Sequence, residues 1–187
     1  MTVRGARCEV RGAEEAVDLH ESSGGSKSVA ELNAGPAPRG LRLVIHIDGA
    51  ARGNPGPAGI GVMLEAEDGL LRRALCQYIG KATNNVAEYE ALLFALREAR
   101  KLQPAVVKIR SDSELLVRQI QGRYRVKNPR LAALYAQALN LINQLSAVSC
   151  RLSVEHVGRE LNRQADALAN RAIDEALSGV LREGGRS

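Results

Sequence analysis

The chain has 187 residues, which is enough for one domain of ordinary size and a tail. Apolar residues make up 45% of it but aromatic residues only 3%, so we expect an aliphatic core and exclude aromatic stacking platforms as a general way of binding ligands. The net charge of +5 divides into −1 over residues 1–40 (five basic, six acidic) and +6 over residues 41–187 (21 basic, 15 acidic), which favours a polyanionic partner but is equally compatible with none.

Residues 1–40 have the pattern of a tail. They contain Gly24-Gly25, a cluster of serines, Pro36 and Pro38, and no sustained hydrophobic periodicity. Such a segment buries too little apolar surface to offset the entropy lost on ordering. We therefore expect a disordered or weakly ordered tail over 1–40 and one folded domain over 41–180.

Three strands are predicted directly after the tail. Their apolar patterns cover Leu41–Asp48, Ala58–Ala66 and Leu71–Ile79, and Asp68-Gly69 is a hairpin signal between the second and the third. Asp48 ends the first of these strands, and a turn rich in glycine and proline follows it.

Helices and strands alternate in the rest of the domain. Asn84 or Asn85 can cap a helix that runs to about Leu102, before Pro104. The remaining predicted elements are a strand over Val106–Arg110, helices over Ser113–Gln121 and Pro129–Leu145, a strand over Cys150–Val157 and a helix from Asn162 to about Leu177. The order β-β-β-α-β-α-α-β-α predicts a mixed sheet with helices on its faces.

Four acids lie at the ends or beginnings of separate predicted elements. They are Asp48, Glu88 in the first turn of a helix, Asp112 after the fourth strand, and Asp166 in the first turn of the last helix. Carboxylates from separate elements suit a site that holds two hard cations on a phosphodiester. Taken singly, each acid is equally well explained as a helix-start or turn residue.

Asp166 has a further property in the sequence. It is spaced i, i+3 and i+7 with Ala169 and Ile173, which predicts that it shares their core-facing stripe. A buried carboxylate must be paired, hydrogen-bonded or bound to metal. His46 lies on the same strand face as Asp48, and we expect it to fill the core or the edge of the site.

Four segments resemble, in their order along the chain, the motifs of type I ribonuclease H. They are DGAARGNPGP, TNNVAEYEALLFAL, SDSELLVRQIQGRYRVKNP and HVGRELNRQADALANRAID, and the resemblance runs from about Leu43 to Asp174. It implies a ribonuclease H-like α/β fold with a five-stranded mixed sheet in the order 3-2-1-4-5, and a catalytic domain over 41–180. It further implies hydrolysis of the RNA strand of RNA/DNA hybrids to 5′-phosphate and 3′-hydroxyl ends, with a role in removing RNA primers and R-loops.

The resemblance also implies roles for individual residues. Asp48, Glu88, Asp112 and Asp166 would hold two Mg²⁺ ions, with Mn²⁺ as a substitute and Asp48 shared by both. His156 matches the family's mobile histidine, which assists proton transfer or product release, although a plain loop histidine is the alternative. The residues expected to contact the hybrid are Asn54, Thr83, Asn84, Asn85, Ser111 and Ser113, some of which could equally serve as helix caps or turn residues.

Two departures from the family pattern concern substrate binding. The longer relatives insert a basic helix and protrusion where this chain has only Gly122–Asn128 (GRYRVKN). Arg123, Arg125 and Lys127 would then supply a smaller basic surface, with a solvated charge cluster as the alternative. Glu114 replaces an uncharged amide and would repel phosphate if it faced the hybrid.

Cellular context follows from what the sequence lacks. Three widely spaced cysteines form no CxxC or Cys/His cluster, no apolar run has the length of a membrane span, and the first 17 residues have no apolar core of the signal-peptide type. We expect a reduced, cytoplasmic monomer without membrane association. The competing functions are a catalytically silent hybrid-binding module and a related integrase or resolvase acting on DNA.

Overall fold

The computed structural model describes residues 7–10 and 39–183 of the chain. The strands are β1 (Arg7–Val10), β2 (Arg42–Ala51), β3 (Gly56–Ala66), β4 (Arg72–Ala82), β5 (Val106–Ser111) and β6 (Arg151–His156). The helices are α1 (Asn84–Lys101), α2 (Glu114–Ile120), α3 (Pro129–Ala147) and α4 (Arg163–Glu183), with a short 3₁₀ helix, Arg159–Leu161, before α4. No helix in the described ranges combines the length and the apolar character that a membrane span requires.

One mixed sheet organises the fold, with its strands in the order β1-β4-β3-β2-β5-β6. β2, β3 and β4 form an antiparallel meander, and β2, β5 and β6 are parallel. The predicted five-strand order is therefore confirmed. A sixth strand, β1, comes from the predicted tail and pairs antiparallel with the edge strand β4. The other residues of that tail, apart from those at its end, lie outside the described ranges.

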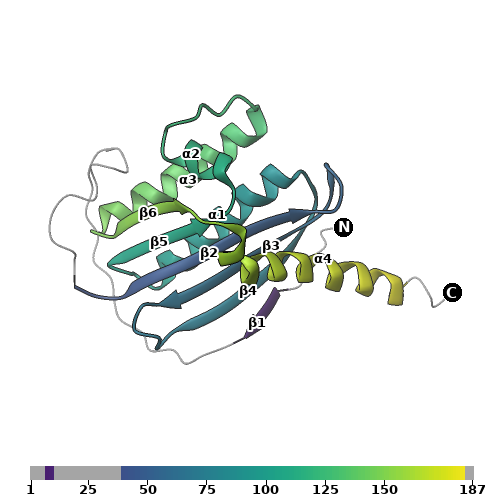
Figure 1. Cartoon of the computed structure of the whole chain (residues 1–187), viewed down its shortest axis with the longest axis horizontal. Coiled ribbons are helices and arrows are strands. Elements are labelled where there is room, and N and C mark those ends of the chain that lie inside the picture. Colours follow the sequence, from purple (N-terminus) through teal and green to yellow (C-terminus); the bar gives the residue numbers. More distant parts are fainter. Residues whose placement is uncertain (1–6, 11–38, 184–187) are drawn as a thin grey trace.

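Helices cover both faces of the sheet (Figure 1). α1 packs on β2 and β3 with α3 against it, and α4 packs across β3, β4 and β2. Two glycines show that these are opposite faces. A Cβ on Gly49 would meet the backbone of α1, whereas a Cβ on Gly61, which is paired with Asp48, would lie 2.1 Å from the carbonyl oxygen of Ala165 in α4. Because neighbouring strand residues alternate between faces, Asp48 lies on the α4 face.

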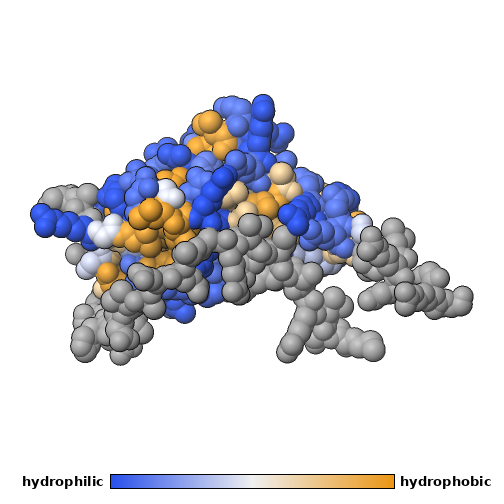
Figure 2. All heavy atoms as spheres, turned by 90° about the horizontal axis from the view of Figure 1, so that it is seen from below, coloured by the Kyte–Doolittle hydropathy of each residue, from blue (hydrophilic) through white to orange (hydrophobic). Residues whose placement is uncertain are grey.

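The core is aliphatic, as the composition predicts. β2 contributes Leu43, Ile45 and Ile47, each fully buried, and α1 contributes a run of buried Leu and Ala side chains against them. Exposed large apolar residues lie apart in sequence, and Figure 2 shows apolar areas separated by hydrophilic ones on the visible described surface. Exposed apolar residues of this kind are normal for a folded domain.

Two element boundaries differ from the predicted ones in ways that matter for the site. β2 continues to Ala51, paired with Ala58 of β3, so Asp48 lies inside a strand and not at its end. The cap of α1 is Thr83, whose Oγ1 accepts a hydrogen bond from the backbone N–H of Val86 at 3.4 Å, in place of the predicted asparagines. Both shifts come from pairing and capping geometry that apolar periodicity does not encode.

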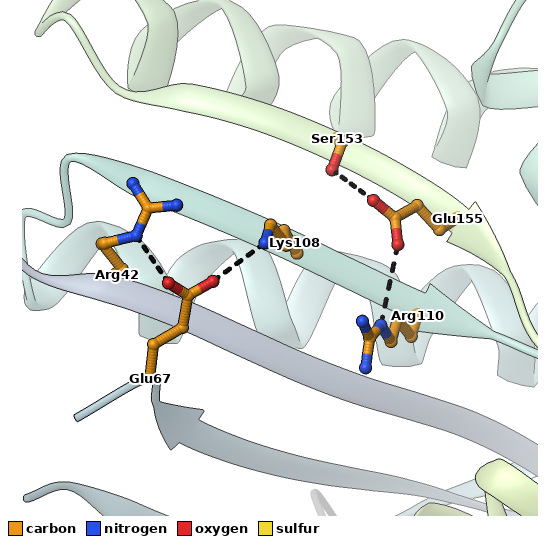
Figure 3. A network of polar contacts seen from close by, with 6 residues as sticks. All are labelled: Arg42, Glu67, Lys108, Arg110, Ser153 and Glu155. Atoms are coloured by element: carbon orange, nitrogen blue, oxygen red, sulfur yellow. Dashed lines mark hydrogen bonds and ion pairs between the residues drawn. The ribbon is translucent and has the colours of Figure 1, made fainter. Parts of the chain in front are cut away.

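Three basic side chains of the sheet are paired with carboxylates. Glu67 accepts hydrogen bonds from Arg42 of β2 (2.5 Å) and Lys108 of β5 (2.9 Å), and Arg110 lies 3.6 Å from Glu155 of β6 (Figure 3). The hydrogen bonds from Arg42 and Lys108 lower the pKa of Glu67 to about 2, so it remains ionised at neutral pH. These basic residues therefore add little to any attraction for a polyanion.

Candidate metal-binding active site

Three of the four predicted acids meet at one end of the sheet. Asp48 comes from β2, Glu88 from the start of α1, and Asp112 from the residue after β5. One oxygen of each lies within 4.8 Å of the others. Asp48 and Glu88 are each 6% exposed, and the side chain of Asp112 is 17% exposed. Since hard divalent cations prefer oxygen ligands, the cluster has the chemistry of a metal site.

The proximity of these carboxylates changes their protonation. Burial raises the pKa of Asp48 to about 7, and the charges of Asp112 and Asp166 add to the effect. Burial also raises the pKa of Glu88 well above its usual range, followed by the charges of Asp48 and Asp112, while Arg159 and Asn84 oppose the rise. Without a cation, the cluster therefore holds protons that an ordinary surface carboxylate loses near pH 4.

Asp166 lies at the same site as the other three acids, but it is exposed and not buried as predicted. It lines a cleft of about 640 Å³ together with Asp48, Glu88 and Asp112. The residue is exposed, however, whereas Ala169 and Ile173 are fully buried. The prediction that Asp166 is buried is wrong. This residue shares the helix face of Ala169 and Ile173, but the first turn of α4 borders the cleft and is exposed there. Its charge therefore remains hydrated and needs no buried partner.

Close backbone approach at Gly49 brings Glu88 beside Asp48. A Cβ on Gly49 would lie 2.2 Å from both the carbonyl carbon of Ala87 and the backbone nitrogen of Glu88. Real Cβ contacts are never that short, so only glycine allows α1 to begin this close to β2. The residue after the central acid thus sets the separation of two carboxylates.

Gly49→Ala is therefore expected to displace the start of α1 and to destabilise the protein by about 3 kcal/mol, at the upper end of the usual cost of overpacking. Affinity for a divalent cation should also fall, because Glu88 moves from Asp48. Chemical denaturation and titration with Mg²⁺ check this. Gly69→Ala is the control, since nothing lies within 4 Å of its Cβ and only its φ of +76° is unfavourable, costing about 1 kcal/mol. Wild-type stability in Gly49→Ala would contradict the prediction.

Two further side chains contact Asp112. Asn162 is 1% exposed, and its Nδ2 donates to Asp112 Oδ1 at 2.9 Å and to the carbonyl oxygen of Ile47 at 3.0 Å. Arg159 is almost fully exposed, and its Nε lies 3.6 Å from Asp112 Oδ2. One oxygen of Asp112 is thus held by a buried amide, and the other faces a solvated guanidinium in the cleft.

Comparison with known proteins gives the family. Residues 46–172 match the family described as "Reverse transcriptase-like". The "Ribonuclease HI" of Halobacterium salinarum is 40% identical over 138 residues, which are 74% of this chain and 67% of that protein. The chain belongs to the ribonuclease HI family. The "Bifunctional protein Rv2228c" of Mycobacterium tuberculosis is 44% identical over 141 residues, 75% of this chain but only 38% of that longer protein.

A solved structure extends the likeness to three dimensions. It is described as "LC11-RNase H1 in complex with RNA/DNA hybrid", with 46% identity and a TM-score of 0.66 over 73% of this chain and 99% of that one. The ribonuclease HI fold predicted from the sequence motifs is thereby confirmed.

The residues predicted from the ribonuclease HI motifs to contact the hybrid divide into two groups by position. Asn84 lines the cleft, and its Nδ2 lies 3.5 Å from Glu88 Oε1. Asn54 is exposed, and its Oδ1 accepts from the backbone N–H of Asn84 at 3.3 Å, so the β2–β3 turn is tied to the start of α1. Thr83 caps that helix, and Asn85 is exposed beside it.

The residues around Asp112 are arranged differently. Ser111 is fully buried, and its Oγ accepts from the backbone N–H of Ser113 at 3.1 Å, which leaves no surface for the predicted hybrid contact. Ser113 caps α2 through Leu116. His156 is exposed at the end of β6, opposite Ser111 in the parallel ladder, so it is the last strand residue and not a loop residue. It does not contribute to the lining of the acidic cleft.

The segment that stands in place of the ribonuclease HI protrusion is short. Arg123, Arg125 and Lys127 are all exposed between α2 and α3. The segment begins with Gly122 at a φ of +73°, and the guanidinium of Arg118 lies 5.3 Å from the ring centre of Tyr124. Glu114, the departure expected to repel phosphate if it faced the hybrid, forms an ion pair with Arg118 at 2.7 Å, so much of its charge is compensated.

Sequence reasoning missed several residues of the cleft. Arg159, Arg163 and Asn170 line it beside the acids, and the buried Asn162 donates a hydrogen bond to Asp112. All four lie within the HVGRELNRQADALANRAID segment, where the sequence pattern marks Asn162 only as the start of a helix. The signal that could have drawn attention to it is an amide side chain four residues before an acid at a helix start.

Proposed function

We propose that this protein is an endoribonuclease that hydrolyses the RNA strand of RNA/DNA hybrids, leaving 5′-phosphate and 3′-hydroxyl ends. The observation that carries the proposal is the convergence of Asp48, Glu88 and Asp112 within 4.8 Å in a chain of the ribonuclease HI family. A related structure whose description includes an RNA/DNA hybrid supports the choice of substrate. We propose residues 41–180 as the catalytic domain, which includes all four acids.

The residues present fit a divalent cation. Glu88 Oε2 is buried and has no hydrogen-bond partner within the described part of the chain. A bound cation would supply the partner that this oxygen lacks. We propose that Asp48, Glu88, Asp112 and Asp166 hold two Mg²⁺ ions, with Mn²⁺ as a substitute and Asp48 shared. When bound, such ions activate water and stabilise charge on a phosphodiester.

The chain's own residues then perform two tasks. The carboxylates release their protons on loading, because only their ionised forms bind a cation. Asn84 presents an amide in the cleft and Asn54 and Asn85 present exposed amides next to it, and these groups can form hydrogen bonds with phosphate oxygens and 2′-hydroxyls. Dependence on the 2′-hydroxyl is the means by which such a site separates RNA from DNA.

One assay tests the function directly. A labelled RNA/DNA hybrid, a DNA duplex and an RNA duplex of matched sequence are incubated with the protein in Mg²⁺. Internal cleavage of only the RNA strand in the hybrid is expected. Cleavage of the DNA duplex would instead indicate an integrase- or resolvase-like nuclease, and binding without cleavage of any substrate would indicate a silent hybrid-binding module.

His156 is expected to assist the reaction without being essential. Its ladder partner, Ser111, is the residue before Asp112, and its side chain is exposed at the surface. His156→Ala should lower kcat by about a hundredfold, the low end of general acid–base contributions. Single-turnover and steady-state kinetics on the hybrid check this. A rate equal to wild type would reduce His156 to an ordinary surface residue, and complete loss would make it essential.

The basic segment is expected to contribute to affinity and not to chemistry. Replacing Arg123, Arg125 and Lys127 together by Gln should make the plot of log affinity against log salt shallower by about 2–3, because each phosphate contact contributes about 0.9. Turnover at saturating hybrid should stay near wild type. Lys101→Gln, at the far end of α1, is the control. An unchanged salt slope in the triple variant would show that these charges are merely solvated.

The cellular role is a further part of the proposal. We propose that the protein removes RNA primers and R-loops, because both contain RNA/DNA hybrids, and that it acts as a cytoplasmic monomer. Sedimentation in the presence and absence of hybrid tests the oligomeric state.

A further inference from the structure

Asn162 joins three elements behind the acidic cluster. Its buried amide lies between the 3₁₀ helix and α4, and it contacts both Ile47 within β2 and Asp112 directly after β5. The two hydrogens of its Nδ2 have two acceptors, the carbonyl oxygen of Ile47 at 3.0 Å and Asp112 Oδ1 at 2.9 Å. The donor capacity of this amide group is therefore fully used.

The orientation of the amide follows from these partners. If the group were reversed, Asn162 Oδ1 would face a carbonyl oxygen and a carboxylate, which are both acceptors. The Nδ2 side must therefore face Ile47 and Asp112, and Oδ1 must point the other way. A buried amide oxygen without a donor is costly, so a donor is expected on that side.

His46 Nδ1 is a nitrogen that can carry such a donor hydrogen. Across the described residues, Asn162 Oδ1 and His46 Nδ1 are both buried polar atoms with no assigned hydrogen-bond partner. Both residues line a second cavity, of about 500 Å³, on the α4 face of β2. A proton on His46 Nδ1 directed at Asn162 Oδ1 would satisfy both atoms at once.

We propose that Asn162 is a positioning residue that fixes the Asp112 carboxylate, and that His46 holds the Asn162 amide in the orientation this requires. Asp112 follows a strand end, so without Asn162 its side chain could rotate away from Asp48 and Glu88. The bond to Oδ1 restrains it and leaves Oδ2 facing the cleft. Such outer partners of ligating carboxylates commonly affect metal affinity or activity by about 10–100-fold.

The test uses the full chain and titrates it with Mg²⁺ alone by calorimetry, which does not require catalysis. Asn162→Ala is expected to weaken Mg²⁺ binding by about 10–100-fold. A second readout, the kinetics of hybrid cleavage, rests on the proposed function. In Asn162→Ala, kcat should fall while KM for the hybrid stays close to the wild-type value. Asn140→Ala, on the exposed surface of α3, is the matched control and should change neither. If wild type binds Mg²⁺ but cleaves no hybrid, the function fails while the calorimetry still decides the role of Asn162.

Rescue and coupling separate positioning from a general structural role. His46→Gln keeps a donor and should bind Mg²⁺ nearly as wild type does, whereas His46→Phe should bind it more weakly. In the Asn162→Ala background, His46→Phe should have no further effect. If Asn162→Ala does not fold, two other measurements test the proposal. The first is the Mg²⁺ affinity of the two His46 variants. The second is the NMR signal of the Asn162 side-chain amide, which Asp112→Asn should shift. Unchanged Mg²⁺ affinity in folded Asn162→Ala, equal behaviour of the two His46 variants, or unshifted amide signals would overturn the proposal.

Discussion

Asp48→Asn is expected to abolish hybrid cleavage in Mg²⁺ while hybrid binding survives. Asp48 lies on β2, which is paired with β3 over nearly its whole length and with β5 up to His46, so its position is rigid. A neutral amide of the same shape fits the site but is a much poorer ligand for a hard cation. We expect kcat to fall about 10³-fold or more, equivalent to about 4 kcal/mol of transition-state stabilisation.

Gel-shift or anisotropy measurements, with the same labelled hybrid as the cleavage assay, separate binding from chemistry. Asp174→Asn is the matched control: that acid is exposed on α4 and forms a surface ion pair with Arg52 at 2.6 Å, which is outside the lining of the cleft. Surface pairs of this kind contribute little to stability. Turnover near the wild-type level in Asp48→Asn would refute the assignment of the acidic cluster as the active site.

The same substitution is expected to stabilise the metal-free protein at neutral and alkaline pH. The pKa of Asp48 is raised from 3.8 to about 7 in the folded state, mainly by burial and then by Asp112 and Asp166. Between these values the folded state binds more protons than the unfolded state, so stability falls as pH rises from about 4 to about 7. The amide that replaces the carboxylate does not titrate. The variant should thus equal wild type near pH 4 and exceed it by about 2–4 kcal/mol above pH 7.

Urea unfolding in EDTA at about pH 4.5 and about pH 8 measures this difference. Glu67, whose pKa shifts in the opposite direction, is common to both proteins, so its contribution cancels. Mg²⁺ should stabilise wild type at the higher pH and have less effect on the variant, because a cation replaces the missing protons. A gap between variant and wild type that is constant with pH, or that closes as pH rises, would contradict the predicted linkage.

Much of the fold could be predicted because it is encoded locally. Alternating or continuous apolar runs predict β2 to β6 within a few residues. Helical spacing, with local signals such as the cap Ser113 and Pro129 in a first turn, predicts the helices. β1 could not be predicted in this way. Its four residues, Arg7–Val10, alternate between polar and apolar for only two periods, which is too short a pattern to predict a strand, and they pair with β4, which lies far along the chain.

The site was partly predictable for a similar reason. An acid on the central strand and another after its parallel neighbour must lie close together once the strand order is known, so Asp48 and Asp112 follow from topology. Asp166 shows the limit of helical spacing. Ala169 and Ile173 are buried, whereas Asp166 on the same face of α4 is exposed in the cleft. Helical periodicity predicts which way a side chain points around the helix, but not how deeply each turn of the helix is buried.

The sequence by itself determined the helices and strands of the folded domain from β2 to α4, the basic charge and the family, since these depend on residue types and their spacing along the chain. Only the tertiary structure decided how close the carboxylates come and what holds them. The backbone contact at Gly49 and the amide of Asn162 join atoms from segments up to 115 positions apart. Burial shared among several elements is also what raises the pKa of Asp48, and no single segment contains that information.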